Sequence, residues 1–185
     1  MVEDPSLNRS SSSHALTFTS PYQCPYDCPN EDCESTFDGG NIPELVTHME
    51  DCHYARMNDR FKFNNLYVHE LSNKGNSEAW DPEVFNCYGC YFCLHFQSLT
   101  SCDALGDIMF LWFLGEDEEA KKFSYILEIS GNGRTLTYKG VPRSIRISSQ
   151  EICDDLDGMV FSPFFWEENE KERKLRVKGC ICLEP

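Results

Sequence analysis

The chain has 185 residues, 41% of them hydrophobic, which is enough for one main domain with a packed core and a small module beside it. Its formal net charge of −15 at pH 7 disfavours binding to nucleic-acid phosphates or to anionic membranes. The longest apolar run, 108–114, is too short to cross a membrane. We find no secretory signal pattern at the start of the sequence. The eleven cysteines therefore indicate a reducing compartment, which is the cytoplasm, the nucleus or both.

The first part of the chain predicts a flexible tail and then a short helix. Residues 1–20 are rich in serine and lack periodicity, so we expect no packed structure there. Further on, apolar residues recur at helical spacing: Ile42, Leu45, Val46 and Met49. Asn41 can cap this helix and Glu44 can complete a capping box. The pattern places His48 in the last turns of the helix and His53 just beyond its end.

Four residues around this helix have the types and spacing of a structural zinc site: Cys24, Cys33, His48 and His53. Two thiolates and two imidazoles complete a tetrahedral shell and leave no open position for a substrate, so such a site holds a small module together. The gap between the two cysteines is wider than in most zinc fingers. Cys28 could therefore replace Cys24, and Cys52 could compete with His53.

From about residue 61 the apolar pattern changes to a period of two, which is typical of β-strands. The candidate strands are a first one over 61–68 with a break between 63 and 66, and then 84–87, 91–97, 108–114, 124–130, 134–138, 145–148, 158–161 and 175–183. Gly131-Asn132-Gly133 is a strong hairpin signal. Short strands with frequent turn residues predict a mainly β fold, an antiparallel β-sandwich.

Two groups of cysteines outside the first module favour packing over metal binding. Cys87, Cys90 and Cys93 have the spacing of an iron–sulfur or zinc motif, but they fall on a hairpin or bulged strand, where side chains alternate faces and do not converge. We interpret them as core thiols. Cys180 and Cys182 share one face of the last strand, and we expect packed thiols there too.

The sequence shows no catalytic constellation. Two histidines remain beyond the tail and the metal site, His69 and His95, and neither lies in a recognisable nucleophile motif. No glycine-rich phosphate loop is present. We therefore predict no catalytic residues and a protein that binds other proteins. Trp80 is a candidate partner-binding aromatic, with a role in the core equally consistent with its position.

Several stretches resemble the C-terminal part of the Seven-in-absentia (Sina/Siah) ubiquitin ligases, most closely the plant branch. They lie at 21–26, 40–48, 84–89, 92–96, 119–125, 131–134 and 142–146, and together they cover about 21–184. The resemblance implies a Siah-type zinc finger over 21–58 and a TRAF-like β-sandwich over 59–185 that dimerises and binds substrates or adaptors. On the family pattern the zinc ligands match Cys24, Cys33, His48 and His53, although the loop between the cysteines is longer here.

Full-length relatives of this family carry a RING finger that recruits the ubiquitin-conjugating enzyme. The residues before Cys24 contain no cysteine and cannot form one, so we expect an inactive relative and not an enzyme. Its expected partners are RING-bearing relatives, TRAF-type adaptors and substrates, with neither nucleic acid nor membrane among them. The resemblance implies effects on protein turnover in hormone, stress and starvation responses, including autophagy. The alternative is a ligase component that acts through the RING of a heterodimer partner.

Overall fold

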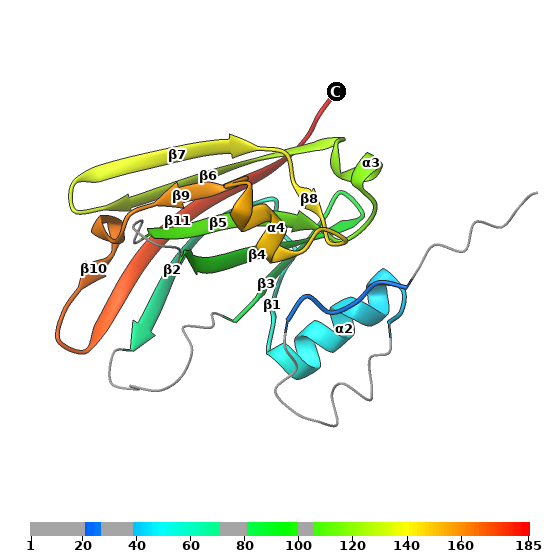
Figure 1. Cartoon of the computed structure of the whole chain (residues 1–185), viewed down its shortest axis with the longest axis horizontal. Coiled ribbons are helices and arrows are strands. Elements are labelled where there is room, and N and C mark those ends of the chain that lie inside the picture. Colours follow the sequence, from blue (N-terminus) through cyan, green and yellow to red (C-terminus); the bar gives the residue numbers. More distant parts are fainter. Residues whose placement is uncertain (1–20, 27–38, 71–80, 100–105) are drawn as a thin grey trace, which may run out of the picture.

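The computed structural model describes residues 21–26, 39–70, 81–99 and 106–185, and Figure 1 shows their arrangement. Two β-sheets pack face to face, which confirms the predicted sandwich. The first sheet contains β1 (Arg56–Asn58), β3 (Glu83–Cys87), β4 (Cys90–Leu99), β5 (Gly106–Phe113), β8 (Arg143–Ser144) and β9 (Met159–Phe161). The second sheet contains β2 (Lys62–Glu70), β6 (Phe123–Gly131), β7 (Arg134–Gly140), β10 (Glu167–Glu168) and β11 (Glu172–Leu183).

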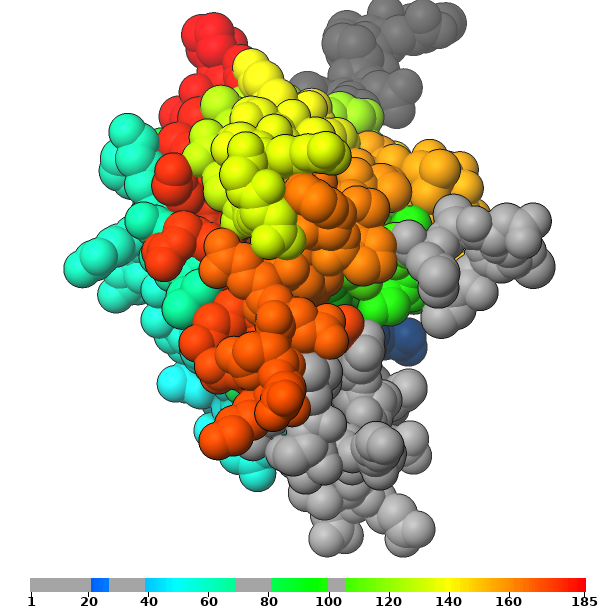
Figure 2. Space-filling model, turned by 90° about the vertical axis from the view of Figure 1, so that its left-hand side faces the viewer, coloured from blue at the N-terminus to red at the C-terminus, as the bar shows by residue number. Residues whose placement is uncertain are grey.

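Short helices lie between and beside the strands. They are α2 (Ile42–His53), α3 (Asp117–Ala120), α4 (Ser149–Asp154) and the 3-10 helix η1 (Pro163–Phe165). Figure 2 shows the orange segments around η1 and β10 on the face turned to the viewer, where β10 pairs with β11. No helix in the described ranges is long and apolar enough to span a membrane.

The strand pattern is largely confirmed. The hairpin between β6 and β7 turns at Asn132 and Gly133, whose φ angles of 50° and 76° are the left-handed values that a type I′ turn requires. The break expected between 63 and 66 is absent, because Asn64 and Asn65 continue the ladder of β2 with β11. The fold is therefore a mainly antiparallel sandwich, with strands somewhat longer than the pattern indicates and with parallel pairs between β1 and β3 and between β5 and β8.

The strand expected over 145–148 is wrong. β8 ends at Ser144, whose Oγ accepts the backbone N–H of Arg146 at 3.2 Å, while the N–H of Ile147 donates to the Ser144 carbonyl at 3.0 Å. These local hydrogen bonds form a turn in place of a ladder. Ser148 then caps α4 by accepting the N–H of Glu151.

The central core lies between the two sheets and is rich in aromatic side chains. Phe92 meets Phe123 edge to face, with 5.1 Å between ring centroids, and Phe113 stacks on Phe123 at 5.6 Å. Such pairs contribute about 1 kcal/mol beyond the burial of their surface. The aromatic pairs bridge β4 and β5 of the first sheet to β6 of the second, and so fix the spacing of the layers.

A second core covers the outer face of the first sheet. Leu45 and Met49 of α2 and Ile152 of α4 are fully buried there against Phe110 and Trp112 of β5. This explains why β5 is buried on both faces, as its continuous apolar run predicts. Because β1 also pairs with β3, the N-terminal segment and the sandwich share contacts; the division at 58/59 stays a prediction.

A buried carboxylate joins the two sheets. Glu83 is only 3% exposed and accepts hydrogen bonds from Asn58 of β1 and from Asn65 and Tyr67 of β2. Arg56 lies over the Tyr67 ring, with Cζ 5.2 Å from its centroid. A buried carboxylate is tolerated only when donors surround it in this way. The side chain of Glu83, on β3, thus links β1 of the first sheet to β2 of the second sheet.

Removal of this carboxylate should destabilise the fold far more than loss of a surface carboxylate. Glu83→Ala leaves three donors without their acceptor, and we expect it to lower the free energy of unfolding by about 2–4 kcal/mol. Glu128→Ala, which breaks only the exposed ion pair with Lys178, should cost less than about 1 kcal/mol. Urea unfolding at pH 7 measures both. Equal costs for the two variants would contradict the role of Glu83 as a link between sheets.

Candidate metal centre and adjoining pocket

Helix α2 carries both candidate histidine ligands. It begins with the predicted capping box: Asn41 Oδ1 accepts the N–H of Glu44, and Glu44 Oε2 accepts the N–H of Asn41, both at 3.0 Å. The expectation that His53 lies just beyond the helix is wrong, because the N–H of Tyr54 still donates to the Met49 carbonyl. His53 is the last helical residue, and Tyr54 ends the helix in the left-handed conformation with φ 53°.

Three of the predicted metal ligands converge. The ligand atoms of Cys24, His48 and His53 all lie within 4.8 Å of one another, and Cys24 Sγ is 3.2 Å from His53 Nε2. Burial lowers the pKa of His48, and burial together with His48 lowers the pKa of His53. Both imidazoles are therefore held towards the neutral form, which binds metals. In the parts of the chain that the structure describes, no other three His, Cys, Asp or Glu side chains converge in this way.

The structure also bears on the alternative ligands. It places His53, and not Cys52, beside Cys24 and His48. Cys28 and Cys33 lie outside the described residues, so the fourth ligand stays a prediction. A β-bridge between Tyr22 and Gly40 joins the two chain segments on either side of them, with hydrogen bonds of 3.0 and 3.2 Å.

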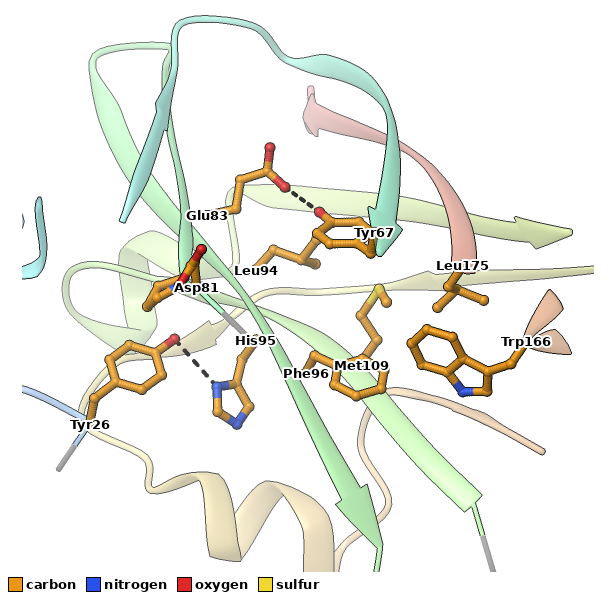
Figure 3. Close-up of a pocket in the computed structure, with 11 residues that line it drawn as sticks. Tyr26, Tyr67, Asp81, Glu83, Leu94, His95, Phe96, Met109, Trp166 and Leu175 are labelled. Carbon is orange, nitrogen blue, oxygen red and sulfur yellow. Dashed lines mark hydrogen bonds between the residues drawn. The ribbon is translucent and has the colours of Figure 1, made fainter. Parts of the chain in front are cut away.

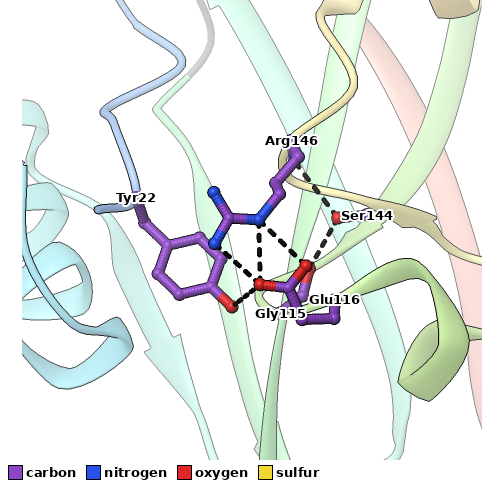
Figure 4. Close-up of polar contacts among 5 residues, drawn as sticks. All are labelled: Tyr22, Gly115, Glu116, Ser144 and Arg146. Carbon is purple, nitrogen blue, oxygen red and sulfur yellow. Dashed lines mark hydrogen bonds and ion pairs between the residues drawn. The ribbon is translucent and has the colours of Figure 1, made fainter. Parts of the chain in front are cut away.

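On the N-terminal side of Cys24, a cluster of charged and aromatic groups attaches the segment to the sandwich (Figure 4). Arg146 donates to both carboxylate oxygens of Glu116 at 2.7–3.0 Å and lies over the Tyr22 ring, with Cζ 4.1 Å from its centroid. The Tyr22 hydroxyl donates to the same carboxylate at 2.8 Å, and the Arg146 hydrogen bonds lower the pKa of Glu116. This cluster fixes the position of the chain two residues before Cys24.

On the C-terminal side of Cys24, Tyr26 points towards the first sheet. Its hydroxyl lies 3.3 Å from Cys93 Sγ and 3.3 Å from Nδ1 of His95 (Figure 3). The His95 ring also lies 4.7 Å from the ring of Trp112. Burial lowers the pKa of His95 to about 4, so the ring is neutral at pH 7.

Tyr26 and His95 form one end of a pocket of about 110 Å³, and Trp166 forms the other end (Figure 3). The indole Nε1 of Trp166 is fixed by a 2.8 Å hydrogen bond to Asp107. The lining is mostly apolar, with carboxylates at one side; its residues are Tyr26, Tyr67, Asp81, Pro82, Glu83, Leu94, His95, Phe96, Met109, Trp166 and Leu175. A small apolar pocket with a few polar groups suits one side chain of a partner better than a cofactor.

The ladder between β3 and β4 reaches the wall of this pocket. It begins with the pair Glu83–Leu94, both of which line the pocket, and the residue before Glu83, Pro82, has no N–H to extend it. Beyond this pair, His95 to Leu99 of β4 pair with β5.

The remaining sequence candidates take other places. Cys93 is buried in the outer core whereas Cys87 and Cys90 contact the central core, so the three thiols do not converge, as predicted. Cys180 and Cys182 share a face, with 3.6 Å between their sulfur atoms. Trp80 and the side chain of His69 lie outside the described residues.

Sequence reasoning missed the pocket and the role of Tyr26. The partners of Tyr26 are 67 and 69 positions away in the chain, and no local pattern relates such residues. The one available signal was the symmetry of two tyrosines flanking a candidate ligand, in Tyr22-Gln23-Cys24-Pro25-Tyr26.

Comparisons with known proteins agree with this architecture. A family described as "Sina, TRAF-like domain" matches residues 85–179. The chain is 41% identical to "E3 ubiquitin-protein ligase SINAT2" of Arabidopsis thaliana over 89% of this chain and 53% of SINAT2. It is 42% identical to "E3 ubiquitin-protein ligase DIS1" of Oryza sativa subsp. japonica, over 86% of this chain and 54% of DIS1. The chain thus spans about half the length of these two relatives.

A shorter relative is matched over more of its length. The chain is 36% identical to "Probable inactive E3 ubiquitin-protein ligase SINAT6" of Arabidopsis thaliana, over 89% of this chain and 79% of that protein.

The lowered pKa of His95 predicts how the stability of the fold depends on pH. Between its ordinary pKa of 6.5 and the folded value of about 4, the unfolded chain binds a proton that the folded chain does not. Stability should therefore fall as pH drops from 6.5 to 4, by on the order of 3 kcal/mol from this group. His95→Gln should lack this contribution. Urea unfolding of both proteins at pH 7 and pH 4.5 measures it, and identical pH dependences would contradict the assignment.

Proposed function

Because the chain belongs to the Seven-in-absentia (Sina) family, we propose that it is a partner-binding member in which a structural zinc site supports a TRAF-like sandwich. The sandwich binds other proteins of the ubiquitin pathway. The observation that carries this proposal is the apolar pocket between Tyr26 and Trp166. A small, mostly apolar pocket with a few polar groups can hold one side chain of a bound protein segment.

The residues near α2 suit zinc. A thiol and two neutral imidazoles within 4.8 Å are the donor set of a structural zinc finger, and Cys33 would complete it, with Cys28 as the alternative. Among the described residues of the cluster there is no carboxylate, whereas calcium and magnesium prefer oxygen ligands. Zinc would supply folding energy here and no chemistry, because four protein ligands leave no position for a substrate.

The binding surface suits a protein segment. The pocket of about 110 Å³ would take one of its side chains. Trp80, adjacent in sequence to Asp81 of the pocket, remains our candidate aromatic for this surface. The partners that we propose are RING-bearing Sina relatives, TRAF-type adaptors and the substrates of both, bound by a homo- or heterodimer.

We propose further that these 185 residues do not transfer ubiquitin unaided. The name of SINAT6 supports this interpretation. The chain would then alter which targets are ubiquitinated, in the cytoplasm or nucleus, in hormone, stress, starvation and autophagy responses. The alternative is a ligase component that acts through the RING of a heterodimer partner; the names of SINAT2 and DIS1 favour it.

The zinc assignment predicts a measurable stoichiometry. The purified chain should contain about one zinc per molecule, and Cys24→Ser and His48→Ala should lose it because each removes a ligand. Cys180→Ser, which removes a thiol far from α2 in the sequence, is the matched control and should keep it. Mass spectrometry of the metal content measures all four proteins. Comparison of Cys28→Ser with Cys33→Ser identifies the fourth ligand, and zinc retained by Cys24→Ser would refute the site.

Partner binding and ligase activity are tested together. The tagged chain should capture RING-bearing relatives or TRAF-type adaptors from cells. Asp81→Arg, at the exposed rim of the pocket, should reduce capture because the longer side chain blocks the pocket. Asp59→Arg makes the same charge change at an exposed position that does not line the pocket and should leave capture intact.

The same preparation distinguishes the two functions. With ubiquitin-activating and ubiquitin-conjugating enzymes, the chain alone should form no ubiquitin chains. Activity of the isolated polypeptide would refute the inactive reading. Activity that appears only when a RING-bearing relative is added, and exceeds that of the relative alone, would favour the alternative.

A further inference from the structure

Tyr26 belongs both to the metal centre and to the pocket. It lies two residues after Cys24, and its ring centroid is 5.5 Å from that of His53. On its other side the ring is 5.7 Å from His95 and 6.2 Å from Trp112 of the sandwich. Its hydroxyl contacts Cys93 and His95, and the residue forms part of the pocket wall.

The link from the ligand to this tyrosine is stiff. Pro25 lies between Cys24 and Tyr26, and the proline ring fixes its own φ angle near −65°. Proline also restricts the backbone of the residue before it, which here is the candidate ligand. The cluster of Tyr22, Glu116 and Arg146 holds the chain on the far side of Cys24. The backbone between Cys24 and Tyr26 therefore has fewer free rotations than an ordinary dipeptide, which favours transmission of a displacement of Cys24 to Tyr26.

We propose that Tyr26 is a positioning residue that couples metal occupancy to the shape of the partner-binding pocket. With the metal bound, Cys24 and Pro25 hold the Tyr26 ring against the sandwich and close that end of the pocket. Without it, Tyr26 leaves, and the Nδ1 of His95 loses a hydrogen bond. This inference rests on the proposed function, because it takes zinc as the metal and the pocket as the binding site.

The proposed coupling acts both ways: zinc affects partner binding, and partner binding affects the affinity for zinc. Loss of zinc should open the pocket at the Tyr26 end, and a partner that needs the closed pocket should bind more weakly. By linkage, the same partner should raise the affinity for zinc by the same factor, which for coupled sites is typically about 5–150-fold. The sandwich itself stays folded, because its central core lies between the sheets and contains no residue of the metal segment.

Three buried methionines provide separate reporters in one spectrum. Met49 lies on α2, Met109 lines the pocket, and Met159 lies in the central core outside the pocket lining. The full chain, labelled with ¹³C in its methionine methyl groups, is compared with zinc and after chelation. Substitution of each methionine by leucine assigns its signal. We expect chelation to shift the Met49 and Met109 signals and to leave that of Met159 in place.

Two variants test the route through Tyr26. Pro25→Gly keeps every ligand and every pocket side chain but softens the link, so it should bind zinc and lose the response of Met109 to chelation. Tyr26→Phe keeps the ring and removes the hydroxyl contacts, so that response should become smaller. Pro142→Gly, in the connection between β7 and β8 and outside the pocket lining, is the matched control and should respond like the parent chain.

Each outcome decides the proposal. A Met109 signal that stays in place when zinc is removed overturns the coupling, and so does a normal response in Pro25→Gly. Collapse of all three signals together means that the metal holds the whole sandwich, which also overturns a specific route through Tyr26. Zinc content is measured first: a parent chain without zinc refutes the metal assignment and this inference with it. Bound zinc with an unmoved Met109 signal refutes the coupling alone.

Discussion

The outer face of the first sheet is apolar and has to be covered, and this constraint decides where the rest of the molecule lies. Phe110 and Trp112 of β5 are fully buried on that face, under Leu45 and Met49 of α2. Removal of such surface from water is the main driving force for packing. Because this contact positions α2, His48 and His53 lie beside Cys24, and the candidate metal site lies next to the pocket.

The same packing shows how the proposed metal site could matter for function without a catalytic position. If zinc completes a four-ligand shell there, no position remains for a substrate, and any effect of the metal on other molecules has to pass through the protein. The tyrosines on either side of Cys24 connect this site directly to the sandwich. Tyr22 binds the Glu116–Arg146 pair, and Tyr26 contacts His95. The N-terminal segment thus contributes directly to the wall of the pocket.

Local features of this fold were accessible from the sequence, and contacts between distant segments were not. The capping box of Asn41 and Glu44, the turn at Asn132 and the doubly buried β5 all follow from patterns within a few residues. The end of α2 depends on the hydrogen bond from the Tyr54 N–H, and the turn after Ser144 depends on the one from the Arg146 N–H to Ser144 Oγ. The residue pattern does not reveal these bonds, so both predictions were wrong. The carboxylate cluster of Glu83 joins residues up to 25 positions apart. The contact of Tyr26 with His95 spans 69 positions, beyond any periodicity.

The size of the pocket would have a consequence for selectivity if it receives partners as we propose. A cavity of about 110 Å³ holds a single side chain, so it would discriminate at one position of a bound segment and leave the neighbouring positions unread. Such a receptor would be strict at one residue and permissive elsewhere, which would let a single protein serve many clients that share little else.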